Sequence, residues 1–423
     1  MKIRFRYCLV AMFVAVMVGV CSHVGAEIRP ELSDTDREIF SQWNAWPRGQ
    51  NSLSDSGVPL KIAVEDATPE SMDALVAAFP QLQSVTLWTI KNPRDMPEIA
   101  KSLGKLKDLT KLGILPSSVL KDLAAILSQT PRLQELSLNL YDNIPAEGLE
   151  ALGNLKSVRR LSLSMDESHD FLSGQVISQF SSLEYLHIDG QASGHTLRAI
   201  GKQQSLKILG FQSHHSCIAD ADLANLSRLH NLEQFYFGGR CRPPKKTGER
   251  PAETIPPQRF LSSEGMTDEG LTLLSGLTQL KVLGLGGSNA ITDEGLSALR
   301  DLKQLERLSV TSKKLTGSGL RHLSGLTQLK FIGLLHSGFE PQNIHYLTQF
   351  PALEQINVGG TPVERNDGWK ELAQLRVLKN LKQIDIELPF FYEDAAGRPI
   401  MGTERPYHWL QERLPGVNIM GTD

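Results

Sequence analysis

Apolar residues recur at a regular spacing along most of this chain. The pattern L-x-x-L-x-L, with Leu, Ile, Val or Phe at the three apolar positions, begins at residues 82, 109, 133, 158, 183, 206, 232, 280, 305, 329, 353 and 381. Most successive starts are 23 to 28 residues apart. A fixed period of this length indicates a repeat protein rather than a set of separate globular domains.

The chemistry of one unit predicts the fold. Leu308 and Val310 alternate with polar residues, as on a strand with one buried face. Leu296, Leu299 and Leu302 recur at helical spacing. Neither apolar face can be buried within one unit, so neighbouring units must stack. We predict an α/β solenoid: a curved horseshoe with a parallel concave β-sheet of roughly fifteen strands and convex helices.

Two of the repeats are near copies. Met266–Leu271 and Ile291–Leu296 share the sequence T-D-E-G-L. With the L-x-x-L-x-L pattern, they resemble bacterial leucine-rich-repeat proteins of planctomycete type, and the cysteine-containing repeats of ribonuclease-inhibitor-like and F-box relatives. The resemblance covers nearly the whole chain after residue 26 and implies a binding solenoid without catalytic residues to carry over. The sequence departs from it where Ser312, Ser337 and Thr361 replace the Asn or Cys after the strand, so no continuous asparagine ladder is expected.

The first 26 residues have the pattern of a secretory signal peptide. Three basic residues precede an apolar run from residue 7 to residue 20, and residues 24–26 offer a cleavage site before Glu27. The run is short for a transmembrane helix, which needs about 20 apolar residues. We therefore expect a secreted or periplasmic protein with no membrane insertion after cleavage. Retention as a membrane anchor, or acylation at Cys21 as a lipoprotein, are the alternatives.

Four regions follow from these patterns. They are the signal peptide (1–26), an N-terminal cap or linker (27–56), the solenoid (57–388) and a C-terminal cap (389–423). A helix at Ser33–Trp43 is predicted in the first cap. A helix around Tyr407–Arg413 and a strand at Val417–Ile419 are predicted in the second. Such caps are needed because a terminal repeat has no neighbour on one side to bury its apolar face.

Composition and charge exclude several classes of protein. Charged residues are 22% and hydrophobic residues 40% of the chain, unlike a disordered or a polytopic membrane protein. The net charge of −3 becomes −6 when the three basic residues of the signal peptide are removed. This mild acidity favours solubility, and we expect no nucleic acid among the partners.

Two of the four cysteines lie in the signal peptide, which leaves Cys217 and Cys241 in the mature chain. Each is in a loop that leaves a predicted strand, on adjacent repeats. Neighbouring strands are about 4.8 Å apart, and the Cα atoms of a disulfide are about 4.4–6.8 Å apart. We expect a disulfide between them in an oxidising compartment, and no metal. A zinc site with His214 and His215, or two free thiols, are the alternatives.

One gap interrupts the repeats, between Leu232 and Leu280, and it spans 48 residues, twice 24. The spacing predicts a degenerate repeat that keeps register, with a strand at Arg259–Ser262. In this repeat the proline-rich, basic segment 239–258 would replace the convex helix, because proline cannot continue a helix. The alternative is a loop inserted outside the sheet.

Strand side chains alternate, so the third, fifth and seventh positions of each motif are predicted to face the concave side. Gly or Ser occupies the fifth position at residues 113, 137, 162, 210, 284, 309 and 333. Larger side chains stand out: His187, Tyr236 and Phe260 at the fifth position, Tyr185 and Asp189 beside His187, and Phe331 further along. We predict that these residues, except Phe331, form the centre of a partner site, since exposed aromatics beside polar groups are typical interface anchors. The alternative is that the rings pack on one another without a ligand.

The motifs of several enzyme classes are absent from the sequence. H-E-x-x-H, G-x-x-x-x-G-K-[ST] and G-x-S-x-G do not occur. We therefore predict a non-catalytic recognition scaffold, without a cofactor, that binds a protein, peptide or glycan on its concave face. The alternative is an accessory or catalytic extracytoplasmic protein, with its chemistry in the proline-rich segment or the C-terminal cap.

Overall fold

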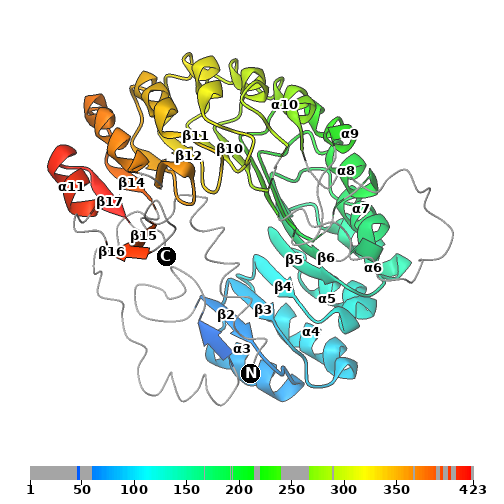
Figure 1. The fold of residues 1–423 in the computed structure, drawn as a ribbon. Helices are drawn as coiled ribbons and strands as arrows, with labels where there is room; N and C mark the ends of the chain where they lie inside the picture. Colours follow the sequence, from blue (N-terminus) through cyan, green and yellow to red (C-terminus); the bar gives the residue numbers. More distant parts are fainter. Residues whose placement is uncertain are drawn as a thin grey trace.

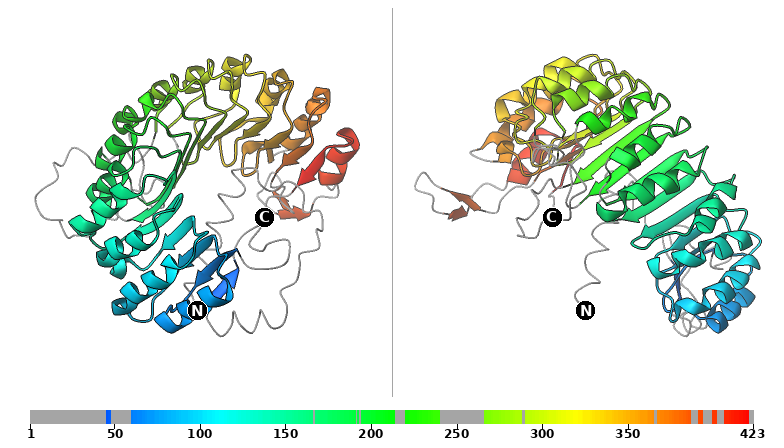
Figure 2. Two further views of the ribbon diagram at one scale, coloured as in Figure 1. Left: turned by 180° about the vertical axis from the view of Figure 1, so that it is seen from behind. Right: turned by 90° about the vertical axis from the view of Figure 1, so that its right-hand side faces the viewer.

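The computed structural model describes residues 45–47, 60–165, 167–190, 192, 194–213, 220–239, 266–287, 290–364, 367–386, 391–393, 399–401 and 406–420. Over these residues one curved sheet lines the inner side of an arc, and helices cover its outer side (Figure 1, Figure 2). The predicted α/β solenoid of leucine-rich-repeat type is confirmed. No helix among the described residues combines the length and the apolar character needed to cross a membrane.

The strands of the sheet follow one another in chain order. β1 (Ala45–Pro47) pairs antiparallel with β2, and every later pair of neighbours is parallel. The parallel strands are β2 (Lys61–Val64), β3 (Ser84–Leu87), β4 (Lys111–Ile114), β5 (Glu135–Leu140), β6 (Arg160–Met165), β7 (Tyr185–Asp189), β8 (Ile208–Ser213), β9 (Gln234–Gly239), β10 (Val282–Leu285), β11 (Arg307–Val310), β12 (Phe331–Gly333), β13 (Gln355–Asn357), β14 (Gln383–Asp385) and β17 (Asn418–Met420).

The sheet has fifteen strands, close to the predicted number, but one member differs. The prediction of a strand at Arg259–Ser262 between β9 and β10 is wrong, because these two strands pair directly, with Gln234 opposite Val282. Residues 259–262 themselves lie outside the described part of the chain. The fifteenth strand is β1, which lies within the predicted N-terminal cap.

The core is a continuous stack of inward-facing apolar side chains. Residues at the same strand position, such as Leu209, Phe235 and Leu283 on β8, β9 and β10, are fully buried. The positions after the strands hold buried hydroxyl groups in place of the absent asparagine ladder. Ser312 Oγ donates to the carbonyl oxygen of Ile291, and Thr361 Oγ1 donates to that of Val358. These bonds satisfy polar groups inside the core.

The convex side changes along the chain. In the first part it carries α-helices: α3 (Pro69–Ala78), α4 (Met96–Gly104), α5 (Leu123–Gln129), α6 (Ala146–Asn154), α7 (Asp170–Ser178), α8 (Gly194–Ile200), α9 (Asp220–Leu223) and α10 (Asp268–Leu274). Short 3₁₀ helices accompany them: η1 (Pro93–Asp95), η2 (Ser117–Asp122), η3 (Glu167–His169) and η4 (Leu226–Arg228). After α10 the convex elements are 3₁₀ helices: η6 (Gly295–Leu299), η7 (Ser318–Leu323), η8 (Pro341–Gln349), η9 (Pro362–Glu364) and η10 (Gly368–Val377).

The aspartates of the T-D-E-G-L copies form hydrogen bonds that link consecutive repeats. Asp268 accepts hydrogen bonds from the backbone N–H and the hydroxyl of Thr292, at 2.9 and 2.7 Å. Asp293 in turn binds Thr316 in the next repeat, again through both groups. A Cβ on Gly295 would lie 2.0 Å from Asp268 Oδ1, so the glycine makes room for the carboxylate. Each aspartate therefore binds the segment that leads into the convex helix of the following repeat.

The C-terminal end of the core is covered by the chain itself. β17 pairs with β14, and α11 (Pro406–Arg413) packs against η10. The Trp369 and Trp409 rings meet edge to face with centroids 5.2 Å apart. A separate antiparallel pair is formed by β15 (Phe391–Glu393) and β16 (Pro399–Met401). The predicted helix and strand of this cap thus occur, the strand one residue later than expected.

Candidate functional site on the concave sheet

The strand register sets the distances between the predicted binding residues. Tyr185, His187 and Asp189 alternate along β7 and are half-buried, whereas the residues between them are buried. His187 lies opposite Gly210 on β8, and Gly210 lies opposite Tyr236 on β9. The sheet therefore places the tyrosine two strands from the histidine, in the same row.

Glycine in this row makes room for the larger side chains. A Cβ on Gly210 would meet His187 Nδ1 at 2.9 Å, so the imidazole lies against the glycine. Burial lowers the pKa of His187 below its usual 6.5, against the opposing effect of the Asp189 carboxylate. The ring is thus favoured in its neutral form at pH 7, with one nitrogen able to donate and the other to accept a hydrogen bond.

Tyr236 presents a protonated hydroxyl group. Its Oη donates to Gln234 Oε1 at 3.0 Å. Burial raises the pKa of Tyr236 to about 12, outweighing the opposite effect of the nearby Arg307 guanidinium. The phenol therefore stays neutral over the physiological pH range and combines an apolar ring with a polar tip.

Two arginines on the same face were not among the predicted residues. The Arg160 guanidinium carbon lies 4.0 Å from the centre of the Tyr185 ring, on the next strand. The Arg307 guanidinium carbon lies 4.1 Å from the centre of the Phe331 ring, again on the next strand. Both arginines occupy the third motif position, the row that holds Tyr185. A search of that row for Arg followed one repeat later by an aromatic residue would have found both.

We use the name concave cluster for Tyr185, His187, Tyr236, Arg307 and Phe331. All five are half-buried and come from β7, β9, β11 and β12. The row at the fifth position between and beside them carries Gly210, Gly284, Ser309 and Gly333. Small residues next to aromatic and cationic side chains leave flat contact area around a few anchors, which suits a partner that packs against the sheet.

Several predicted site residues lie outside the described part of the chain. They are Phe260, Cys217, Cys241, His214 and His215. Phe260 was expected beside Tyr236 on the strand next to β9. That strand is β10, and its Gly284 lies opposite Tyr236. The disulfide stays a prediction. Within the described ranges, no group of three or more His, Cys, Asp or Glu residues could hold a metal ion.

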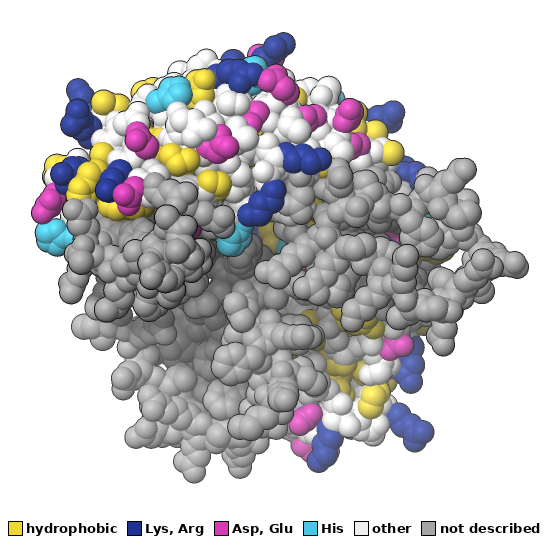
Figure 3. All heavy atoms as spheres, in the orientation of Figure 1, with side chains coloured by type: hydrophobic (Ala, Val, Ile, Leu, Met, Phe, Trp, Pro, Cys, Tyr) yellow, Lys and Arg dark blue, Asp and Glu magenta, His cyan; other side chains and the backbone are white. Residues whose placement is uncertain are grey.

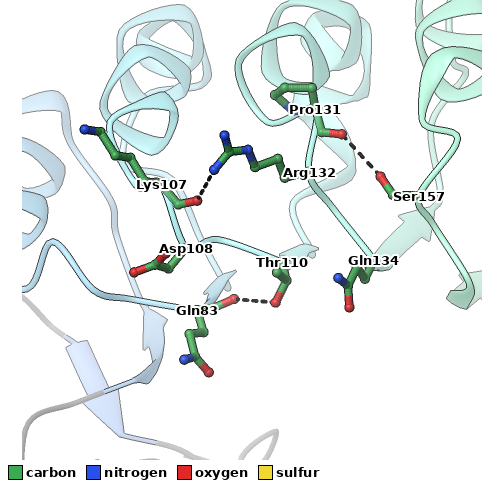
Figure 4. A pocket seen from close by; sticks show the side chains of 8 residues that line it. All are labelled: Gln83, Lys107, Asp108, Thr110, Pro131, Arg132, Gln134 and Ser157. Atoms are coloured by element: carbon green, nitrogen blue, oxygen red, sulfur yellow. Dashed lines mark hydrogen bonds between the residues drawn. The ribbon is translucent and has the colours of Figure 1, made fainter.

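A hollow of about 660 Å³ lies where the chain enters β4, β5 and β6 (Figure 4). Residues that line the hollow and belong to neighbouring repeats are joined by hydrogen bonds. Arg132 Nη1 donates to the carbonyl oxygen of Lys107 at 3.3 Å, and Ser157 Oγ donates to that of Pro131 at 3.3 Å. These polar groups already hold neighbouring repeats together, so the hollow is a seam of the solenoid rather than a second candidate site.

A ladder of opposite charges follows the same edge of the sheet. Four lysines each pair with a glutamate of the previous repeat at 2.7–2.9 Å: Lys207 with Glu184, Lys281 with Glu233, Lys330 with Glu306 and Lys382 with Glu354. The Lys281–Glu233 pair joins β9 and β10, the two strands on either side of the 48-residue interruption in the repeats. On the side of the molecule that Figure 3 shows, acidic and basic side chains of the described residues are also interspersed.

Comparisons with known proteins find similar solved structures of low sequence identity. No protein-family model and no curated protein matches the sequence. Similar solved structures include an internalin from Listeria monocytogenes, at 18% identity over 83% of this chain and 94% of the internalin, with a TM-score of 0.43. A leucine-rich-repeat protein of Leptospira interrogans is 15% identical over 85% of this chain and 89% of its own, also with a TM-score of 0.43. An internalin C2 from Listeria monocytogenes is 14% identical over 63% and 90%, with a TM-score of 0.33.

Proposed function

We propose that this protein is a non-catalytic, extracytoplasmic recognition scaffold that binds a protein partner on its concave sheet. The observation that supports this most is the concave cluster, in which strand register gathers aromatic rings and a cation beside small residues. Tyr and Arg are enriched among the residues that dominate binding energy at protein interfaces. A rigid parallel sheet holds such anchors at little entropic cost on binding.

Location and kinship are parts of the same proposal. The basic and apolar pattern of residues 1–26 supports export, and cleavage would leave Glu27 as the first residue. The T-D-E-G-L copies support kinship to planctomycete-type and ribonuclease-inhibitor-like repeats. The mild acidity of the mature chain supports a partner other than nucleic acid. N-terminal sequencing of protein recovered from the extracytoplasmic fraction tests the export step directly.

The binding proposal is tested by capturing partners with the mature chain and with the Tyr236→Ala variant. Removing the ring should weaken binding by about 2 kcal/mol or more. Thermal unfolding should change little, because Tyr236 points away from the core. Phe171→Ala is the matched control, since Phe171 is an exposed aromatic residue, 60% accessible, outside the concave cluster. A partner that is lost with Phe171→Ala and kept with Tyr236→Ala would contradict the proposed site.

A further inference from the structure

Arg307 is a half-buried cation that has no ion-pair partner among the described residues. Its Nε is buried and has no hydrogen-bond partner. Arg160, which stacks on an aromatic ring in the same way, lies 3.4 Å from Glu135. No corresponding ion pair joins Arg307 to a carboxylate of the described residues. The two arginines therefore share a geometry and differ in electrostatic balance.

An unbalanced charge of this kind has a cost. Partial burial removes hydration from the guanidinium, and the Phe331 ring compensates for this over one face only. Burial accordingly lowers the pKa of Arg307, and only the weak effect of Tyr236 opposes it. The missing counter-charge points to an anionic group that arrives from outside, although the buried Nε itself is not open to such a group.

The surroundings of Arg307 select the kind of anion. The Phe331 ring covers one face of the guanidinium, so a ligand must approach along its edge, where the N–H groups point. A planar carboxylate accepts two parallel hydrogen bonds from that edge. Tyr236 adds a neutral hydroxyl and an apolar ring nearby. A Cβ on Gly333 would lie 2.8 Å from Ser309 Oγ and 3.0 Å from the Phe331 ring, so glycine lets the Phe331 ring lie in its place beside the guanidinium.

We propose that Arg307 recognises an Asp or Glu side chain of the protein segment that binds the concave cluster, with an apolar neighbour of that acid packing on Tyr236. This inference rests on the proposed function and names the chemistry of the partner. Arg160 is not assigned this role, because Arg160 and Lys111 already share the Glu135 carboxylate, at 3.4 and 2.5 Å.

The test selects short random peptides by phage display on the immobilised mature chain. Recovered peptides are synthesised, and their binding is measured by fluorescence anisotropy. We expect an acidic residue at a constant position, whose change to Asn or Gln weakens binding about tenfold or more. Arg307→Gln should weaken binding of the acidic peptides by the same factor. The variant should also bind an acidic peptide and its Asn or Gln version with equal affinity. Arg307→Lys should retain part of the preference, since it keeps the charge without the planar fork.

Arg160→Gln is the matched control and should change affinity by no more than about threefold, because its charge is already paired. Peptides without a constant acidic position, or equal binding to Arg307→Gln, would overturn the inference. If those peptides still depended on Tyr236, the proposed function would stand. A selection that yields no peptide dependent on Tyr236 would overturn both. Arg307→Gln should unfold at the same temperature as the wild type or higher, which separates lost recognition from lost folding.

Discussion

The two halves of the concave sheet carry the same arginine–aromatic pair in different electrostatic settings. On β6 and β7, Arg160 stacks on Tyr185 and is paired with Glu135. On β11 and β12, Arg307 stacks on Phe331 without a carboxylate among the described residues. A cation that the fold has neutralised contributes to stacking of the repeats, whereas one left unbalanced is available to a partner. Residue type alone therefore does not identify a binding anchor, because the same side chain can already be paired within the fold.

The halves also differ on the convex side. α-Helices cover the strands before β10, and 3₁₀ helices cover most of the strands after it. The same aspartate contact precedes both kinds of convex element. Asp220 accepts hydrogen bonds from the backbone N–H and the hydroxyl of Thr267, which is the N-cap of α10. Asp293 accepts hydrogen bonds from Thr316, Gly317 and Gly319 around the start of η7. The contact between repeats is therefore kept where the convex helices change from α to 3₁₀.

The largest expected effect comes from breaking the junction between the halves. Phe235 on β9 is fully buried, and its ring meets Phe211 edge to face with centroids 6.2 Å apart. Phe235→Ala should destabilise the protein by about 3–5 kcal/mol, through lost burial and a cavity. Urea unfolding followed by circular dichroism measures this. Two separate transitions in the variant would show that the halves unfold independently, whereas one shared transition is expected for a continuous core.

The second effect concerns the aspartate contacts between repeats. Asp293→Ala should cost about 2 kcal/mol, because it leaves several N–H groups without their acceptor. Burial opposes ionisation of Asp293, but the hydrogen bonds from Thr316, Gly319 and Gly317 outweigh it and hold its pKa below the usual 3.8. Its contribution is therefore complete above pH 3.8 and is lost as the pH falls through the lower folded-state pKa.

Stability measured from pH 6 downwards should show this loss in the wild type. Asp293→Asn, which cannot titrate, should lack that component. An identical pH profile for the two proteins would contradict the assigned role of the carboxylate.

A third experiment makes the first half of the sheet resemble the second. Glu135→Gln removes the carboxylate shared by Lys111 and Arg160 and should cost about 1 kcal/mol or less, since both ion pairs are partly exposed. It should also leave Arg160 able to bind an acidic group, so an acidic peptide should gain affinity. Isothermal titration of such a peptide against the wild type and the variant checks this. Unchanged affinity would mean that position on the sheet, rather than charge balance, distinguishes the two arginines.

The smallest expected effect on stability comes with a sharp spectroscopic signal. Tyr236→Phe keeps the ring and removes the hydroxyl that donates to Gln234. The difference in absorbance titration between wild type and variant should show one tyrosine ionising near pH 12, because burial raises the pKa of Tyr236 to about 12. Free energies of unfolding near pH 7 should agree within about 1 kcal/mol. A difference titration centred near pH 10 would place Tyr236 in contact with bulk water instead.

Local pattern was enough to predict most of the fold. The period of two in Leu308 and Val310 and the helical spacing of Leu296 and Leu299 predict their strand and convex element directly. The same pattern misled at the 48-residue gap, where the spacing suggested a strand that the sheet does not contain. The spacing between two motifs gives only the length of chain that joins them. Which strands pair depends on which strand edges meet in the folded protein. The T-D-E-G-L copies marked a repeat without revealing that Asp268 and Asp293 bind the next repeat.

The amino-acid sequence predicted which residues face the core and which face the concave side, because alternation along a strand is a local geometric rule. It placed Tyr185, His187, Asp189 and Tyr236 on that face and left Arg160 and Arg307 unnoticed. Which of these residues meet, and which charges are paired, depends on the folded solenoid. Ion pairs and stacking join residues of neighbouring repeats that are 23 or more residues apart along the chain, and the register of the strands is set by the packing of the whole solenoid.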